Sequence, residues 1–276
     1  MVSFFKYHGL GNDFAVIAAG QYGTQPDEVA RLCDRHRGVG ADGIIFYDLS
    51  SLGDIDARMT IYNQDGSRPQ MCGNGIRCLA RHLVEVLGMK AGELRIATDA
   101  GLRVCQVVDR RRSCWEVAVN MGEARWHLGA PEIVYEGQSL EWVSVNMGNP
   151  HAVVFEPREL DYIDRIGAWA NENKALFPEG VNVEFVRSPG DHRFEVVVYE
   201  RGVGRTQACG TGACAVAVAA WRTGRVDSGQ SVQVDLPGGT LLIEERDDRI
   251  WMTGEAAAVF HGEMQDSGCK PSGEGA

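Results

Sequence analysis

The chain has 276 residues, with 27 basic and 38 acidic side chains, a formal net charge of −11, and 44% apolar and 24% charged residues. This balance is typical of a globular protein, and it disfavours nucleic acid or an anionic membrane surface as the main partner. No run approaches the roughly 18 apolar residues of a membrane span, and residues 1–10 contain Lys6 and His8 instead of a cleavable apolar segment. We therefore expect a soluble, cytoplasmic protein with one large or two medium-sized domains.

Short apolar runs, separated by turn residues such as Asp65-Gly66, predict a strand-rich first half. The expected strands cover residues 3–7, 44–47, 59–62, 94–97, 102–108 and 115–119. A helix is expected after Cys72 and before Gly88, because apolar residues there recur at helical spacing. These residues are Ile76, Leu79, Ala80, Leu83, Val84 and Leu87.

The second half shows the same kind of pattern. Its expected strands cover residues 142–147, 152–155, 181–186, 194–199, 232–236 and 240–244. The run 213–221 is apolar on all sides, so we expect a helix that its domain encloses. We expect the last apolar run, 256–260, to return to the first half and complete it.

Four separated segments recur at one offset of 137 residues. The matched positions are Gly11-Asn12 with Gly148-Asn149, Tyr62 with Tyr199, Cys72 with Cys209, and Gly101 with Gly238. The repeat predicts an α+β fold of two similar strand-rich domains, each wrapped around a central helix, related by a pseudo-twofold axis. We expect residues 1–121 with about 256–264 to form the N-terminal half and residues 122–255 the C-terminal half. They should meet at a cleft holding the active site, and residues 265–276 should form a disordered tail.

Two of the eight cysteines, Cys72 and Cys209, precede glycine-rich turns that each open a helix. The first N–H groups of a helix have no internal partner and, with the helix dipole, attract an anion. A thiol at this place is expected to have its pKa lowered from about 8.5 into the range of ~3.5–7.5, which suits proton transfer near neutral pH. No cysteine pair has the C-x-x-C spacing of zinc or redox sites, so the default for the others is a small buried hydrophobe.

The two helix starts predict a reaction if the halves face each other. A substrate carboxylate could lie between both sets of N–H groups, with its α-carbon between the two sulfurs. One thiolate would remove the α-proton while the other thiol donates a proton to the opposite face, which inverts the stereocentre. The N–H groups would stabilise the developing enolate-like charge. This two-base racemisation or epimerisation needs no cofactor, and no lysine lies near a loop that could cradle the phosphate of pyridoxal phosphate.

Six motifs occur in order along the chain. They are Gly9-Leu10-Gly11-Asn12-Asp13-Phe14, Asn63-x-Asp65-Gly66-Ser67, Met71-Cys72-Gly73-Asn74-Gly75-x-Arg77-Cys78, Met147-Gly148-Asn149-Pro150-His151, Tyr199-Glu200-Arg201-Gly202 and Ala208-Cys209-Gly210-Thr211-Gly212-Ala213. Together they resemble the diaminopimelate epimerase family, from about residue 5 to residue 261. The resemblance implies a cofactor-independent enzyme that interconverts LL- and meso-2,6-diaminopimelate for lysine and peptidoglycan synthesis. Family members are commonly homodimers.

The resemblance also implies roles for particular residues. Cys72 and Cys209 would be the acid/base pair, and His151 and Glu200 would help to set the pKa values of the two sulfurs. The implied substrate-binding residues are Asn12, Asn63, Gly73, Asn74, Asn149, Asn182, Glu200, Arg201, Gly210 and Thr211. Backbone N–H groups of residues 73–74 and 210–211 would hold the reacting carboxylate, and Arg201 suits the distal one through bidentate hydrogen bonds. No metal site is expected.

Some positions depart from the family or allow a purely structural interpretation. Gly43 stands where some members carry a substrate-contacting glutamine, and Arg205 stands where an acidic residue is common. Asn12 and Asn149 could simply be turn residues, but their place in the repeat favours a binding role. Asp13, Asp65 and Arg77 are assigned to structure.

Three rival functions remain. The first is a proline or hydroxyproline racemase, although those enzymes resemble C-G-H-G more than Cys72-Gly73-Asn74-Gly75, and a cyclic imino acid offers no distal group for Arg201. The second is a redox protein in which Cys72 and Cys209 form a regulatory disulfide. The third is a non-enzymatic amino-acid sensor, which should bind its ligand without exchanging the α-proton.

Overall fold

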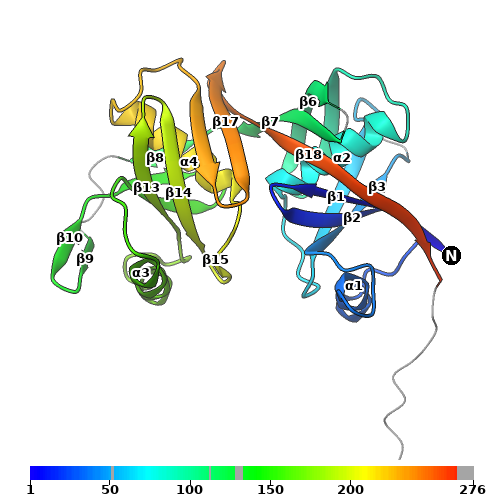
Figure 1. Cartoon of the computed structure of the whole chain (residues 1–276), viewed down its shortest axis with the longest axis horizontal. Coiled ribbons are helices and arrows are strands. Elements are labelled where there is room, and N and C mark those ends of the chain that lie inside the picture. The colour runs from blue at the N-terminus through cyan, green and yellow to red at the C-terminus, as the bar shows by residue number, and fades with distance from the viewer. Residues whose placement is uncertain (51–52, 112, 128–132, 266–276) are drawn as a thin grey trace, which may run out of the picture.

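The computed structural model describes residues 1–50, 53–111, 113–127 and 133–265, and shows two halves side by side, with strands running between them (Figure 1). The expected tail from residue 266 onward, including Cys269, and the Gly129-Ala130-Pro131 segment lie outside the described residues.

The first half alternates strands with two helices. Its strands are β1 (Val2–Gly9), β2 (Asn12–Ala18), β3 (Gly43–Asp48), β4 (Ala57–Asn63), β5 (Glu93–Thr98), β6 (Gly101–Arg111) and β7 (Cys114–Gly122). Helix α1 (Pro26–Cys33) connects β2 to the parallel strand β3, and helix α2 (Gly73–Glu85) connects β4 to the parallel strand β5. The strands therefore lie in chain order, β1 to β7.

The second half repeats this order. Its main strands are β8 (Arg125–His127), β11 (Val143–Asn146), β12 (Pro150–Val154), β13 (Asn182–Gly190), β14 (Arg193–Glu200), β16 (Val232–Leu236), β17 (Gly239–Arg246) and β18 (Arg249–Met264). Helix α3 (Leu160–Glu172) connects the parallel pair β12 and β13, and helix α4 (Gly210–Arg222) connects the parallel pair β14 and β16. Strand β15 (Gly204–Arg205) pairs with β14, and β9 (Ile133–Tyr135) and β10 (Gln138–Leu140) form a separate hairpin.

The helices confirm the repeat. Both α2 and α4 have 13 residues. Their first residues are 137 positions apart (210 − 73), and so are their last residues (222 − 85). Each helix also links a parallel strand pair in the same place in its half. The α+β architecture of two similar halves is thus the expected one.

Strand β18 serves both halves. Its first residues pair with β17 and β7, while Ala257–Met264 pair with residues 2–8 of β1. Strands β1 to β7 and β18 therefore close into a ring, and α2 lies inside it in contact with β1, β7 and β18. This pairing supports our proposal that residues 1–121 with about 256–264 form one unit and residues 122–255 the other.

The four helices differ in burial, and this difference accounts for their positions in the fold. Helix α4 is buried along its whole length from Gly212 to Trp221, as expected for a helix without a polar face. Helices α2 and α4 share the central apolar core, whereas α1 and α3 pack on smaller clusters at the outer faces of the two halves. The two central helices can thus bring their N-termini together where the halves meet.

Several elements differ from expectation. The first central helix ends at Glu85, before Leu87, because the N–H groups of Val86 and Leu87 both bond to the carbonyl of His82. Strand β2 and helix α3 were not predicted, although the continuous apolar run of β2 is typical of a strand buried on both faces. The segment that follows β7 contains short strands that were not predicted, and one of them, β8, pairs with β11.

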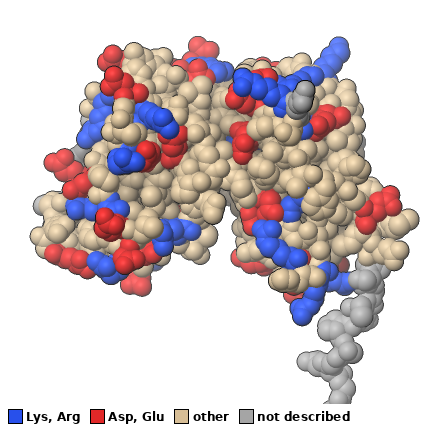
Figure 2. Space-filling view, viewed as in Figure 1, with Lys and Arg blue, Asp and Glu red and all other residues tan. Residues whose placement is uncertain are grey.

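Acidic and basic side chains are mixed over both halves instead of forming a single patch, and the halves are separated by an indentation in the same view (Figure 2). Among the described residues, no helix is long and apolar enough to cross a membrane.

Candidate active site

The two cysteines of the repeat occupy the same position at the two central helices. Cys72 is the N-cap of α2 and Cys209 is the N-cap of α4, both with extended backbone. Their carbonyls accept the first helical hydrogen bonds, from Ile76 at 2.9 Å and Ala213 at 3.0 Å. Both sulfurs therefore lie beside helix starts, where free N–H groups and the helix dipole favour negative charge.

The two helix starts approach each other closely. A Cβ atom built on Gly210 would lie 3.9 Å from the Cα of Gly73 and 2.9 Å from Met252 Sδ. A Cβ atom on Gly73 would lie 2.8 Å from Met252 Cε. Met252 is a fully buried residue of β18, so it fills the space beneath both glycines. A side chain at either glycine would have to displace the thioether end of Met252.

Asn12 lies next to Cys72. Its Oδ1 atom is 3.8 Å from Cys72 Sγ and accepts a hydrogen bond from Asn74 Nδ2 at 3.2 Å. Its Nδ2 atom donates to Asp42 Oδ2 at 3.0 Å. Asp42 was not singled out from the sequence, and it holds the amide of Asn12 with the oxygen toward the sulfur.

Asn149 has the equivalent place beside Cys209. Its Nδ2 atom lies 3.4 Å from Thr211 Oγ1, which is 3.6 Å from Cys209 Sγ. The pairs Asn12–Asn74 and Asn149–Thr211 are each separated by 62 residues. The repeat is therefore preserved in side-chain contacts as well as in the backbone.

His151 is buried and contacts neither sulfur directly. Its Nδ1 atom is 2.6 Å from Glu184 Oε1, and its Nε2 atom is 3.0 Å from Asn149 Oδ1. Glu184 was missed in the sequence because residues 181–186 were interpreted as an apolar strand. The signal available was an acidic residue inside that run, two positions after Asn182 and hence on the same face of the strand.

Glu200 and Arg201 end strand β14. Glu200 Oε1 accepts a hydrogen bond from Thr206 Oγ1 at 2.5 Å. The backbone N–H of Arg201 donates to Asn182 Oδ1 at 2.9 Å, and its Nη1 atom donates to the carbonyl of Glu179 at 2.6 Å. Arg201 is exposed. The structure thus joins Asn182, Glu200 and Arg201 at the end of one strand pair.

Three further positions have local roles. Asn63 is exposed, and its Nδ2 atom donates to Ser67 Oγ at 2.9 Å within its own turn. At Gly43 a Cβ atom would lie 2.5 Å from the carbonyl oxygen of Tyr62, so this backbone has no room for a side chain. Arg205 forms an ion pair with Asp164 of α3 at 2.6 Å, which ties the turn after Glu200 to that helix.

The electrostatic surroundings of the two sulfurs differ. Arg77 is fully buried and donates to the carbonyls of Gly73 and Glu255 and to Asn74 Oδ1. Burial raises the pKa of Cys72, and the Arg77 guanidinium partly offsets this effect while Glu200 adds to it; burial, Glu200 and Glu184 all raise the pKa of Cys209. Arg77 therefore acts on Cys72, whereas Glu200 acts on both sulfurs and Glu184 acts on Cys209.

The expected lowering of both thiol pKa values is wrong for this structure. Burial raises the pKa of Cys72 and raises that of Cys209 well above its ordinary value. Backbone N–H groups of the helix starts do act in the expected direction, but loss of hydration outweighs them. Burial also raises the pKa of the Glu200 carboxyl.

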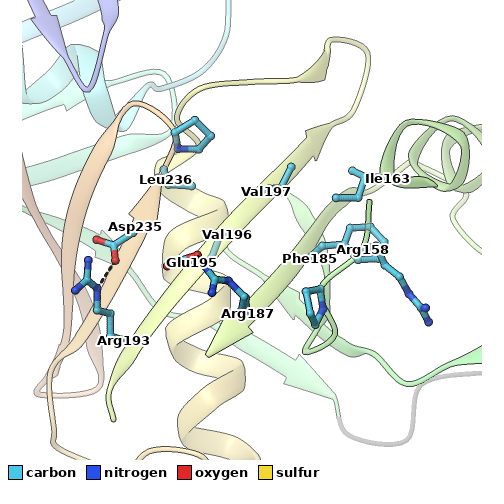
Figure 3. Close-up of a pocket in the computed structure, with 12 residues that line it drawn as sticks. Arg158, Ile163, Phe185, Arg187, Arg193, Glu195, Val196, Val197, Asp235 and Leu236 are labelled. Atoms are coloured by element: carbon cyan, nitrogen blue, oxygen red, sulfur yellow. Dashed lines mark hydrogen bonds and ion pairs between the residues drawn. The ribbon is translucent and has the colours of Figure 1, made fainter. Parts of the chain in front are cut away.

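A cavity of about 420 Å³ lies away from the sulfurs, between α3 and strands β13, β14 and β16 (Figure 3). Its charged residues are matched internally, since Arg193 pairs with Asp235 and Arg187 with Glu195. The seven cysteines among the described residues are free thiols. Within the described ranges, no three His, Cys, Asp or Glu residues are grouped as a metal site would require.

Comparison with known proteins gives a consistent result. The family model for diaminopimelate epimerase matches residues 4–127 and 143–259. A diaminopimelate epimerase of Synechocystis sp. is 41% identical, with 96% of this chain and 99% of the relative covered. One from Desulfitobacterium hafniense is 42% identical, covering 93% and 96%. A chloroplastic diaminopimelate epimerase of Oryza sativa subsp. japonica is 39% identical, covering 94% of this chain and 79% of the relative.

Solved structures agree on the fold. A probable proline racemase from Agrobacterium radiobacter superposes with a TM-score of 0.73 at 17% identity, covering 98% of this chain and 95% of that chain. A hydroxyproline epimerase from Agrobacterium vitis gives a TM-score of 0.72 at 17% identity, covering 95% and 91%.

Proposed function

Because the chain belongs to the diaminopimelate epimerase family, we propose that Cys72 and Cys209 are the two acid/base groups of its reaction. That reaction is the epimerisation of 2,6-diaminopimelate in lysine biosynthesis. The observation that carries the proposal is the convergence of two equivalent helix starts, each capped by a cysteine, with Gly73 Cα 3.9 Å from the Cβ position of Gly210.

In the proposed step the α-carbon of the substrate loses one proton and gains another. The thiolate of one cysteine removes the α-proton, and the electron pair of that C–H bond is delocalised into the adjacent carboxylate. The thiol of the other cysteine then gives its proton to the opposite face of the same carbon. The sulfurs have exchanged protonation states, and the carbon has inverted.

The N–H groups of residues 73–74 and 210–211 are proposed to hold the reacting carboxylate and to stabilise the enolate-like charge, the electrostatic contribution that is usually largest in such sites. Asn12 and Asn149, each beside one helix start, would orient the substrate. Glu200 would accept from its ammonium group, and Arg201 with Asn63 and Asn182 would bind the distal end. His151 would act indirectly, through its contacts with Asn149 and Glu184.

Deuterium incorporation tests this proposal. We expect LL-diaminopimelate incubated in D₂O with reduced protein to give meso product that carries deuterium at the inverted α-carbon. The donating thiol exchanges with solvent, whereas the opposite sulfur takes the substrate's own proton. Early in the reaction the remaining LL substrate should therefore stay unlabelled, as NMR or mass spectrometry of the separated isomers would show.

The same assay separates the rival functions. Proline should gain no deuterium under identical conditions, and oxidised protein should lose activity that reductant restores. Turnover of proline, or activity that consists only of reversible oxidation, would refute the proposal. Binding of diaminopimelate without α-proton exchange would make the protein a sensor.

The pH dependence has a defined direction. Because burial raises the pKa of both thiols, kcat/KM should increase from neutral toward alkaline pH as Cys72 ionises. It should fall again when Cys209 also loses its proton, at higher pH because Glu200 and Glu184 add to the effect of burial there. A profile of kcat/KM against pH reports these free-enzyme pKa values, and a profile that decreases from neutral pH upward would contradict the assignment.

We also propose that the enzyme is cytoplasmic and homodimeric and supplies meso-diaminopimelate for peptidoglycan. Family membership and the reduced state required of both thiols support this placement. Light scattering during size-exclusion chromatography would test the dimer, which should have about twice the 30.1 kDa mass of the chain.

A further inference from the structure

Glu184 is a fully buried carboxylate next to the helix start that carries Cys209. It stands on β13 with 0% of its surface exposed. A Cβ atom built on Gly212 of α4 would lie 2.8 Å from Glu184 Oε1 and 3.3 Å from Cys209 Sγ. Glu184 therefore lies directly beneath the helix start that carries Cys209.

The carboxylate has one ionisable hydrogen-bond partner. Its Oε1 atom is 2.6 Å from His151 Nδ1, and its Oε2 atom is buried without a hydrogen-bond partner among the described residues. Both side chains of this pair are 0% exposed. An isolated buried carboxylate is strongly unfavourable, so the contact with His151 Nδ1 is what accommodates Glu184 in the interior.

A chain of contacts leads from this pair to the sulfur. His151 Nε2 is 3.0 Å from Asn149 Oδ1, Asn149 Nδ2 is 3.4 Å from Thr211 Oγ1, and Thr211 Oγ1 is 3.6 Å from Cys209 Sγ. With Nδ1 held by Glu184, the ring presents Nε2 to Asn149. The amide of Asn149 is then oriented with its nitrogen toward Thr211.

We propose that Glu184 is a positioning residue that acts through His151 and Asn149 to orient the Cys209 side of the site. The inference rests on the proposed role of Cys209. The groups that face Glu184 are His151 of β12, Glu200 of β14 and Cys209 of α4. Together with Glu184 of β13, these residues determine the geometry and charge on the Cys209 side of the site.

Glu184→Gln tests the proposal because it keeps the shape of the side chain and removes its charge. We expect kcat with LL-diaminopimelate to fall on the order of ten- to a hundredfold, as when carboxylates that orient functional histidines are replaced elsewhere, with KM changing much less. The falling limb of the kcat/KM profile should also move to lower pH, because Glu184 raises the pKa of Cys209.

Two further variants control for folding. Glu184→Asp keeps the carboxylate, so the falling limb should return toward its wild-type position even if kcat recovers only in part. Glu195→Gln removes an exposed carboxylate from the neighbouring strand β14, where it pairs with Arg187, and should leave kcat and the pH profile unchanged. Thermal unfolding of each variant shows how much of it is folded under assay conditions.

A double-mutant cycle tests whether Glu184 acts through His151. In a His151→Gln background, Glu184→Gln should lower kcat much less than in the wild type, since residues that act as one unit are not additive. A Glu184→Gln enzyme with wild-type kcat and pH profile would overturn the inference, and so would one that loses only thermal stability. If Cys209→Ala were itself fully active, the proposed function would fail instead, which distinguishes the two failures.

Discussion

Replacing Cys72 or Cys209 by alanine should abolish epimerisation of diaminopimelate and leave the fold intact. A positioned general acid or base contributes on the order of 10²–10⁴ in rate, and inversion requires one on each face of the α-carbon. The substitution removes only a sulfur atom at a helix N-cap, where the cysteine side chain makes no capping hydrogen bond in either helix. Rates of LL-to-meso conversion, measured beside thermal unfolding, would check this.

Each single variant should behave differently in D₂O. In Cys209→Ala the sulfur of Cys72 can still remove and return a proton on its own face, so slow exchange without inversion is expected for one isomer. The matched control is Cys214→Ala, which removes a fully buried thiol from the same helix α4 and should retain activity. Near wild-type inversion by either Cys72→Ala or Cys209→Ala would disprove the paired-thiol mechanism.

The second large effect is expected at the glycines that follow the two cysteines. An alanine Cβ at Gly73 or Gly210 would lie 2.8 or 2.9 Å from Met252, which is fully buried and lies against both helix starts. Such overpacking destabilises a protein by about 1–3 kcal/mol. A displacement of about 1 Å at the reacting groups can lower the rate by roughly a hundredfold, so kcat/KM should fall much more than stability.

The chain contains a suitable control for these substitutions. Gly190 has no atom within 4 Å of its Cβ position and no positive φ angle, so Gly190→Ala should leave both the rate and the melting temperature close to wild type. Measurement of kcat/KM and thermal unfolding for the Gly73→Ala, Gly210→Ala and Gly190→Ala variants would test this prediction. Full activity of both Gly73→Ala and Gly210→Ala would show that the two helix starts do not form the carboxylate site.

Much of the fold could be predicted because a repeat is visible directly in residue order. The offset of 137 residues linked Cys72 to Cys209, and the structure shows two helices of 13 residues at that spacing. Helical periodicity located α2, and the apolar run 213–221 correctly indicated an enclosed helix. Strand β2 and helix α3 were missed although their patterns are present in the sequence: β2 has a continuous apolar run, and α3 has buried residues at helical spacing.

The site was only partly predictable for the same reason. The sequence could indicate Asn12 and Asn149 as a repeated pair, but not that Asp42 holds the amide of Asn12. Nor could it indicate that the side chain of Asn63 donates to Ser67 within its own turn. Contact partners of this kind come from distant segments, and residue order alone does not specify which of them meet.

By itself, the sequence determined the duplicated architecture, the family and the equivalent positions of Cys72 and Cys209 at two helix starts, because these depend on residue types at regular spacing. Only the tertiary structure decided that Met252 lies beneath both glycines, that Glu184 pairs with His151, and that burial raises both thiol pKa values. Those features depend on hydration and on contacts between residues far apart in the chain. Hydration and long-range contacts are determined only when the chain folds and the two halves pack together.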